Sequence, residues 1–241
     1  MTVKKILVLL IIATFLMTIP LAAANSRPPL NKIVFLYREG FAKPPGTPGK
    51  GPPGGEKEYY AFLEKGVKWK ELPVNYVIDP DYSGLSVSFV VEAISNAAEE
   101  WDAHTSTDLF GSYEPVYDAT FDTDSRDGRN ELLFGNYSEA GVIAVTVVWG
   151  YFYGPPGLRE IIEFDILFDT DFTWEDATVN QTVMDLQNIA THEFGHGVGL
   201  ADLYDDQCFE QTMYGYATYG ETKKRTLNTG DIAGIQALYG N

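Results

Sequence analysis

"THEFGHGVGLAD", residues 191–202, contains two of the three histidines in the chain, four positions apart, with a glutamate directly after the first. Residues four apart on a helix lie on one face, so both imidazoles can bind one metal ion. Glu193 lies beside this pair, where a carboxylate can deprotonate a water molecule as a general base. The stretch therefore predicts a helix that carries a catalytic zinc site.

The same spacing continues beyond the second histidine. Gly199 lets the backbone turn after the helix, in a conformation that bulky residues avoid, and so brings Asp202 back toward the metal. A carboxylate is an acceptable zinc ligand, so the predicted metal ligands are His192, His196 and Asp202. Met213, in "CFEQTMYGY" (208–216), lies where a methionine turn would pass beneath such a metal.

A different ligand scheme would use a more distant glutamate as the third ligand. Glu210 and Glu221 are the candidates for that role. This scheme leaves Gly199 and Met213 without a function, so Asp202 is the preferred third ligand.

The remaining pattern predicts an α+β domain with helices packed on a twisted sheet. Apolar residues at helical spacing predict one helix before the strands, a second that contains the zinc motif, and a short third helix after Thr229. Runs of alternating or continuous apolar residues between Asp/Gly-rich turns predict the strands. The expected strands are 71–79, 113–121, 131–135, 141–150 and 160–169, and the first two helices are 86–105 and 181–199.

The N-terminal part of the chain has a different composition. Residues 1–24 combine a short basic start, an apolar run and small residues, as in a secretory signal peptide, with an uncleaved membrane anchor as the alternative. Residues 25–58 hold a short apolar stretch and then a Pro/Gly-rich run, which indicates a short pro-segment or linker. The catalytic domain is expected at 59–241. We therefore expect a secreted or extracellular protein without stable membrane association if the signal is cleaved.

The charge and the cysteine content exclude some classes of protein. A formal net charge of −17 disfavours nucleic acid as a partner, because its phosphates bind Lys and Arg. The single cysteine, Cys208, excludes an internal disulfide and is expected to be a small buried hydrophobe. The acidic excess leaves carboxylates available for calcium.

From about Trp69 to Tyr239 the chain resembles the matrixin-type metzincins, zinc endopeptidases related to the matrix metalloproteinases. The aspartate at 202 makes it similar to the prokaryotic secreted type, some of which have aspartate as third ligand. The resemblance implies the metzincin fold: a twisted, mostly parallel sheet, an active-site helix and a Met-turn below the zinc. It also implies a polypeptide substrate. Vertebrate matrixins hold a second zinc through histidines, whereas the remaining histidine here, His104, is expected at a helix end.

The resemblance also implies where a substrate binds. In the family, peptides add as a strand against the edge strand above the zinc helix. Residues 141–150 are the candidate edge strand, although their nearly continuous valines also suit an interior strand. Tyr214, Tyr216 and Tyr219 suggest an aromatic-lined substrate pocket.

Two acid-rich segments, 121–131 and 168–176, are candidate structural calcium sites. The prediction from the sequence is thus a monomeric, secreted zinc endopeptidase with Glu193 as general base for a zinc-activated water. Two rival hypotheses remain. One is a non-catalytic surface or binding protein stabilised by zinc, and the other is a hydrolase of one dedicated amide substrate.

Overall fold

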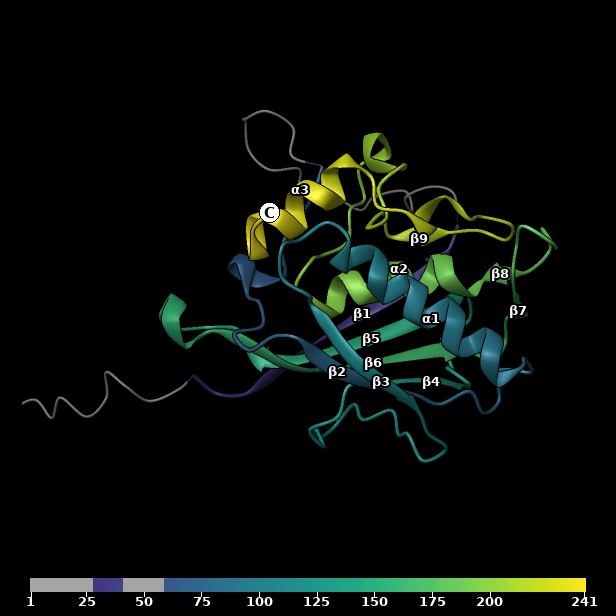
Figure 1. Ribbon diagram of the computed structural model, residues 1–241, viewed down its shortest axis with the longest axis horizontal. Coiled ribbons are helices and arrows are strands. Elements are labelled where there is room, and N and C mark those ends of the chain that lie inside the picture. Colours follow the sequence, from purple (N-terminus) through teal and green to yellow (C-terminus); the bar gives the residue numbers. More distant parts are fainter. Residues whose placement is uncertain (1–27, 41–58) are drawn as a thin grey trace, which may run out of the picture.

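The computed structural model describes residues 28–40 and 59–241. A seven-stranded mixed sheet forms one layer, and the long helices α1 and α2 pack side by side on one of its faces (Figure 1). The strand order is β3-β2-β4-β6-β5-β1-β9, with β7 and β8 forming a separate small ladder. Four of the six pairings in the large sheet are parallel, and the pairings β5–β6 and β1–β5 are antiparallel.

Alternation and apolar runs in the sequence correspond well to these strands. The strands are β1 Asn31–Glu39, β2 Val74–Ile78, β3 Phe110–Pro115, β4 Glu131–Gly135, β5 Val142–Tyr151, β6 Glu160–Asp169, β7 Trp174–Glu175, β8 Met184–Asp185 and β9 Tyr216–Ala217. The 3-10 turns are Glu64–Gly66, Pro156–Leu158, Asp206–Cys208 and Lys223–Arg225. The predicted strands 131–135 and 160–169 are confirmed as β4 and β6.

The helix α1 (Val87–Asp102) begins where Ser86 caps it, because the Ser86 hydroxyl accepts the backbone N–H of Phe89. Its apolar side faces the core and its polar side faces solvent, as the helical spacing predicts. The C-terminal helix α3 (Thr229–Tyr239) begins with a capping box made by Asn228 and Asp231.

Two predicted element boundaries are wrong. The helix α2 spans Leu186–Gly197 and so begins later than the expected residue 181. The reason is that the two residues of β8 pair with β7, and Asp185 then caps the helix by accepting the N–H of Asn188 at 2.9 Å.

The strand expected at 113–121 lies instead at β3, residues 110–115. Beyond Pro115 two backbone N–H groups bond to side-chain carboxylates rather than to a neighbouring strand. Ala119 donates to Asp79 at 3.1 Å and Thr120 donates to Glu131 at 3.3 Å. Val116 still donates to the carbonyl of Ile78 in β2 at 2.9 Å, and beyond it these carboxylates take the place of a β-ladder.

The strand β1 lies upstream of the expected start of the catalytic domain, within the stretch that the sequence assigns to a pro-segment or linker. It pairs along its length with β5 and at its end with β9. Because β1 lies on the outer side of β5, the predicted edge strand 141–150 is an interior strand of this sheet.

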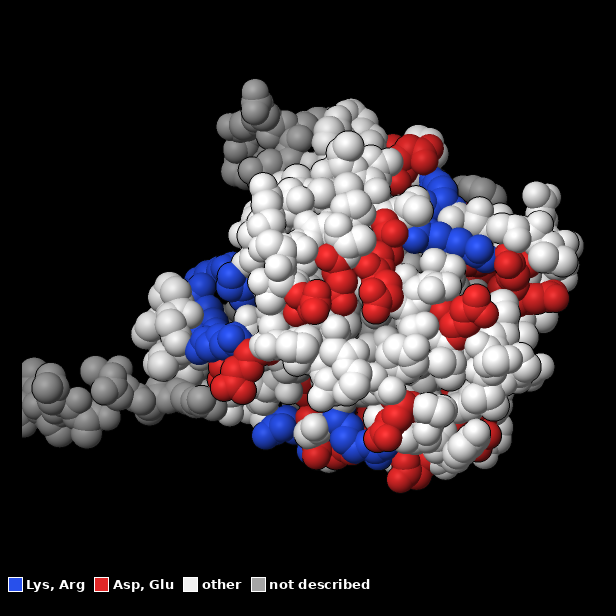
Figure 2. Space-filling model, viewed as in Figure 1, with Lys and Arg blue, Asp and Glu red and all other residues white. Residues whose placement is uncertain are grey.

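The core lies between the sheet and the two long helices and contains many aromatic side chains, among them Trp101, Phe164 and Phe194. Acidic side chains outnumber basic ones in the chain, and they are spread over the face in Figure 2 while the basic ones gather in a few places. Within residues 28–40 and 59–241, no helix is both long and apolar enough to cross a membrane. The predicted signal peptide lies outside the described residues.

Candidate metal centre and active site

The helix α2 and the turn after it bring the motif residues together. His192, Glu193 and His196 lie on α2, which ends at Gly197. Gly199 follows with a φ of +104°, and a Cβ there would lie 2.5 Å from the carbonyl oxygen of Val67. A side chain would therefore be strained and would also clash, which explains the glycine at this turn.

Three potential ligand atoms converge at this turn. The Oδ1 atom of Asp202 lies 3.2 Å from Nε2 of His192 and 3.5 Å from Nε2 of His196. In the part of the chain that the structure describes, these three residues are the one group of histidine, cysteine or acidic side chains with metal-binding geometry, all within 4.8 Å of one another. A tetrahedral zinc with bonds of about 2.0–2.2 Å separates its ligand atoms by about 3.3 Å, so the spacing suits zinc.

Hydrogen bonds hold the two imidazoles in the orientation that a metal requires. His192 Nδ1 lies 2.7 Å from the carbonyl oxygen of Thr212, and His196 Nδ1 lies 3.0 Å from that of Leu200. Each Nδ1 therefore carries a proton and donates it, which leaves the Nε2 lone pairs available.

The potential ligand atoms themselves lack hydrogen-bond partners. Among the described residues, both Nε2 atoms and Oδ1 of Asp202 are buried without one. The other oxygen of Asp202 accepts the phenol O–H of Tyr204 at 2.9 Å, which orients the carboxylate. Buried polar atoms without a partner are costly, and a metal ion at their centre would satisfy all three. The site therefore fits zinc.

Glu193 lies next to this cluster and is fully buried. The hydroxyl of Thr146, on β5, donates a hydrogen bond to its Oε2. Its other oxygen has no partner among the described residues and is available to hold a water molecule. Burial raises the pKa of Glu193 to about 7, despite the opposing effect of His196. The carboxylate is thus held in place from the strand side, with one oxygen available.

Met213 lies beneath the cluster, at the place predicted for the methionine turn. Its side chain is buried against α2 so closely that a Cβ on Gly195 would lie 2.3 Å from the Met213 sulfur. The Met213 carbonyl accepts the N–H of Leu203 at 2.8 Å, and its own N–H donates to Asp231 at 3.1 Å. The turn is thus fixed both to the segment that carries Asp202 and to α3.

Of the three tyrosines predicted to line a substrate pocket, two are buried and one is exposed. Tyr214 and Tyr216 are buried and their ring centroids lie 5.8 Å apart, whereas Tyr219 is partly exposed beside Phe172. The backbone carbonyls of Tyr214 and Tyr216, rather than their rings, both accept hydrogen bonds from the buried ammonium of Lys224.

Two rings of β1 lie directly on the candidate ligands. Phe35 stacks on His196 with ring centroids 3.8 Å apart, and Tyr37 stacks on His192 at 3.7 Å. Sequence reasoning missed these two residues and also Thr146, Tyr204 and Lys224. For β1 the available signal was the apolar stretch "KIVFLYREG" (32–40) within an otherwise Pro/Gly-rich region. Tyr204 is two positions from its partner Asp202, whereas the contacts of Thr146 with Glu193 and of Lys224 with Tyr37 join distant segments.

The alternative third ligands are engaged elsewhere. Glu210 lies 3.8 Å from Nζ of Lys223, and Glu221 lies 3.5 Å from Nζ of Lys224. Neither belongs to the potential metal-binding group among residues 28–40 and 59–241. His104 lies just after α1 and pairs with Glu100 at 3.2 Å, and Cys208 is buried.

In the candidate calcium segments, acidic side chains accept hydrogen bonds from nearby backbone groups. Asp127 accepts the N–H of Arg129 at 2.8 Å, and Asp169 accepts those of Tyr137 and Asp171 at 3.2 and 3.0 Å. These bonds order the two loops.

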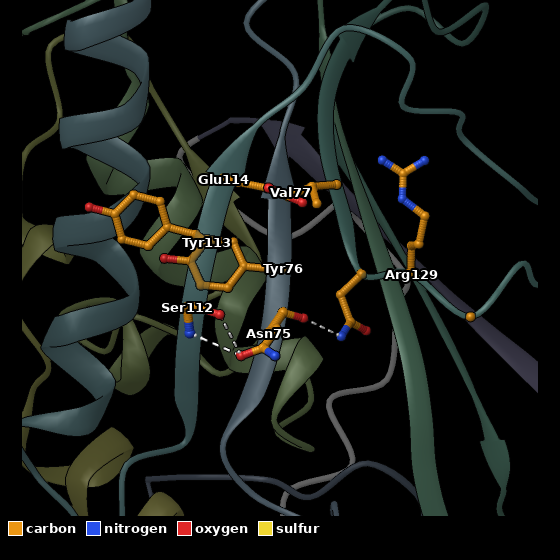
Figure 3. A pocket seen from close by; sticks show the side chains of 9 residues that line it. Asn75, Tyr76, Val77, Ser112, Tyr113, Glu114 and Arg129 are labelled. Atoms are coloured by element: carbon orange, nitrogen blue, oxygen red, sulfur yellow. Dashed lines mark hydrogen bonds between the residues drawn. The ribbon is translucent and has the colours of Figure 1, made fainter.

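A surface hollow lies between β2, β3 and residues 128–130, away from the histidines (Figure 3). Asn75 organises it, because its side-chain oxygen accepts the N–H of Ser112 at 2.9 Å and its carbonyl accepts from Asn130 at 2.8 Å. These polar groups are bonded to one another, and the metal-ligand candidates lie elsewhere.

Comparison with known proteins gives one consistent family. A family model described as Matrixin matches residues 68–240, which is more than half of the chain. Hatching enzyme of Paracentrotus lividus is 31% identical over 193 residues, covering 78% of this chain and 29% of that protein. Matrix metalloproteinase-18 of Xenopus laevis is 28% identical over 183 residues, covering 75% and 35%. Neutrophil collagenase of Homo sapiens is 29% identical over 173 residues, covering 72% and 33%. The chain spans about a third of the length of these relatives.

Proposed function

The chain belongs to the matrixin family, and on that premise we propose that it is a secreted zinc-dependent endopeptidase. The observation that carries the proposal is the buried cluster of His192, His196 and Asp202, whose three facing atoms lack hydrogen-bond partners among the described residues. These residues would hold the metal. When bound, zinc supplies a Lewis acid that makes water more acidic and polarises the peptide carbonyl.

Glu193 would act as the general base. Its unpartnered Oε1 takes a proton from the attacking water, while Thr146 holds Oε2 in place. The protonated Glu193 then gives this proton to the leaving amine, so that the amide C–N bond breaks. Water attacks the carbonyl directly in this scheme, and no covalent acyl-enzyme forms.

Two other functions would use the same metal site. A non-catalytic zinc-stabilised binding protein would need the three ligands but would have no need of Glu193, whose buried and oriented carboxylate therefore favours catalysis. A hydrolase of one dedicated amide substrate would use the same residues, and a mixed peptide library distinguishes it from a broader endopeptidase.

The organisation of the whole chain is part of the proposal. We propose residues 1–24 as a cleaved signal, 25–58 as a pro-segment or linker that includes β1, and 59–241 as the catalytic domain of a monomer. The aspartate at 202 is the residue that supports the prokaryotic secreted type. Calcium in the acidic loops remains a prediction from their composition.

The experiment compares the purified chain with Phe35→Ala/Tyr37→Ala, because the rings of β1 cover both imidazoles. Each form is also made with Glu193→Ala. Zinc content and cleavage of a denatured protein and of a mixed peptide library are measured for all four.

Equal zinc in all four, with cleavage only where Glu193 is intact, supports the endopeptidase. Equal zinc with no cleavage by any form would overturn it in favour of a binding protein or a dedicated substrate.

A further inference from the structure

β1 occupies the position in which an added peptide strand would bind. It runs antiparallel to β5, from Asn31 opposite Gly150 to Arg38 opposite Val142, and then parallel to β9. A peptide that took the place of β1 beside β5 would form the same kind of backbone ladder. β1 therefore shows how an extended chain lies across the candidate active site.

The side chains of β1 alternate between two environments. Phe35 and Tyr37 point toward α2, where their rings lie nearly parallel to those of His196 and His192, at 7° and 2°. Leu36 lies between them and packs on the other side of the sheet with the cluster that contains Val145. The backbone at Leu36 thus crosses between the rings that cover the two candidate ligands.

Tyr37 fills a buried pocket whose floor is Lys224. The Tyr37 side chain is 1% exposed and that of Lys224 is 0% exposed. Nζ of Lys224 donates to the phenol oxygen of Tyr37, and to the carbonyl oxygens of Tyr214 at 2.8 Å and Tyr216 at 2.6 Å. An ammonium group has three N–H donors. Two of them bond to the backbone carbonyls, and the phenol oxygen accepts the third.

A side chain without that oxygen would fit this pocket less well. Phenylalanine would remove one of the three hydrogen-bond acceptors of a buried cation, and the nearest remaining group, Glu221 Oε1 at 3.5 Å, lies beyond a normal hydrogen-bond distance. A site built around a hydroxyl discriminates strongly against an analogue that lacks it. The charge of Lys224 is balanced by Glu221, whose Oε1 lies 3.5 Å from Nζ.

We propose that Lys224 is a specificity-determining residue that selects tyrosine, and that β1 competes for the same pocket through Tyr37 until it is displaced. The proposal rests on the proposed function insofar as the groove beside β5 serves peptide hydrolysis. It names the substrates as extended polypeptides with a tyrosine that enters this pocket.

The test measures binding, so that it does not depend on turnover. A fluorescently labelled peptide with the sequence of residues 31–39, NKIVFLYRE, is titrated into the zinc-loaded chain carrying Phe35→Ala, Tyr37→Ala and Glu193→Ala. A second peptide has phenylalanine in place of the tyrosine. The tyrosine peptide is expected to bind about ten- to a hundredfold more tightly, which is the worth of a hydrogen bond to a charged group.

Variants of the protein locate the effect. Lys224→Met is expected to remove the preference for tyrosine, whereas Lys223→Met keeps it, because Lys223 lies on the exposed side of the same turn. With β1 intact, the Glu193→Ala chain is expected to bind the tyrosine peptide at least about tenfold more weakly than the form without the two rings. Val34→Ala, which changes an exposed side chain of β1, should leave that weak binding unchanged.

Folding is checked by zinc content and circular dichroism. If the chain without both rings does not fold, the variant Tyr37→Phe/Glu193→Ala is used in its place. The tyrosine peptide should then displace β1 more readily from this variant than from the chain that keeps Tyr37. If Lys224→Met does not fold, the affinities of the tyrosine and phenylalanine peptides for the chain that keeps Lys224 still show whether the pocket prefers tyrosine.

Equal binding of the two peptides overturns the assignment of Lys224, and equal binding with and without the β1 rings overturns the competition. Selective binding together with absent cleavage in the Glu193-containing forms would instead overturn the proposed endopeptidase and leave the pocket assignment standing.

Discussion

The two long helices pack against each other, yet they are built differently. α1 buries one side, which includes Val90, Ile94 and Trp101, and exposes polar residues such as Asn96 and Glu99. α2 is buried on nearly every side, although it contains two histidines, a glutamate, an asparagine and a threonine. A helix with polar residues in the core is stable only if each polar group finds a partner. In α2 most of those partners come from other elements, although Thr191 donates to Gln187 within the helix. Among the described residues, the exceptions are the two Nε2 atoms, Oε1 of Glu193 and the amide nitrogen of Asn188.

The comparison shows that apolar packing accounts for the residues that α1 buries, whereas the polar residues buried in α2 are accounted for by the candidate metal site and its hydrogen-bond partners. The Trp101 indole joins the two helices by donating to the carbonyl of Thr191 at 2.8 Å. α1 thus supports the helix that carries the candidate site.

The largest expected effect follows from removing a candidate ligand on α2. His196→Ala should abolish stoichiometric zinc binding and lower peptide cleavage by at least about a thousandfold, because the metal and the general base act on the same water. Glu99→Ala on the exposed side of α1 is the matched control and should change neither. Zinc content and cleavage rate are measured for both. Full zinc content in His196→Ala would contradict the assigned ligand set.

A second expected effect concerns the caps of the two helices. Asp185 caps α2 and is also bonded to Arg225 and to the N–H of Ala177, whereas Ser86 caps α1 from an exposed position. Asp185→Ala should lower the free energy of unfolding by about 2–3 kcal/mol, because it also removes one of the two carboxylates that pair with the partly buried guanidinium of Arg225 and leaves it only Asp176. Ser86→Ala should cost about 1 kcal/mol. Urea unfolding of both variants tests this, and equal losses would remove the distinction between the helices.

A smaller effect is expected where α2 contacts the methionine turn. Gly195→Ala places a Cβ 2.3 Å from the Met213 sulfur and 2.8 Å from the Trp101 ring. The strain, about 1–3 kcal/mol, exceeds the gain of about 1 kcal/mol in helix propensity, so a net loss of about 1–2 kcal/mol is expected. Asn96→Ala on α1 should stay within about 0.5 kcal/mol. Thermal unfolding of the two variants decides it, and an increase in Tm for Gly195→Ala would show that the turn relaxes freely.

The last expected effect is confined to one pH range and concerns the end of α1. Burial raises the pKa of Asp102 from 3.8 to about 6, although the N–H groups of Leu109 and Phe110 oppose the shift. The folded state therefore holds this proton more tightly than the unfolded state. The resulting stability is full below about pH 3.8 and is lost as the pH rises through about 6. Asp102→Asn keeps an accepting oxygen and should flatten the fall in Tm over that range. An unchanged slope would assign the pH dependence to other groups.

Much of this architecture follows from local sequence. The period of the apolar residues identifies α1, β4 and β6, because each of these elements buries one side or both sides against a single core. The spacing of the motif identifies α2, Gly199 and the approach of Asp202, because one helical turn and one tight turn are local geometry.

The tertiary structure decided what lies around that motif. Tyr37 and Lys224 are 187 positions apart, and Thr146 and Glu193 are 47 apart. The alternation in β1 could indicate a strand but not which neighbour it would pair with, and its place beside β5 makes the candidate edge strand an interior one. The short-range pattern thus identified the candidate ligands and the proposed base. Contacts between distant segments decided what covers them, because the pairing of strands and the filling of a pocket depend on surfaces that exist only in the folded chain.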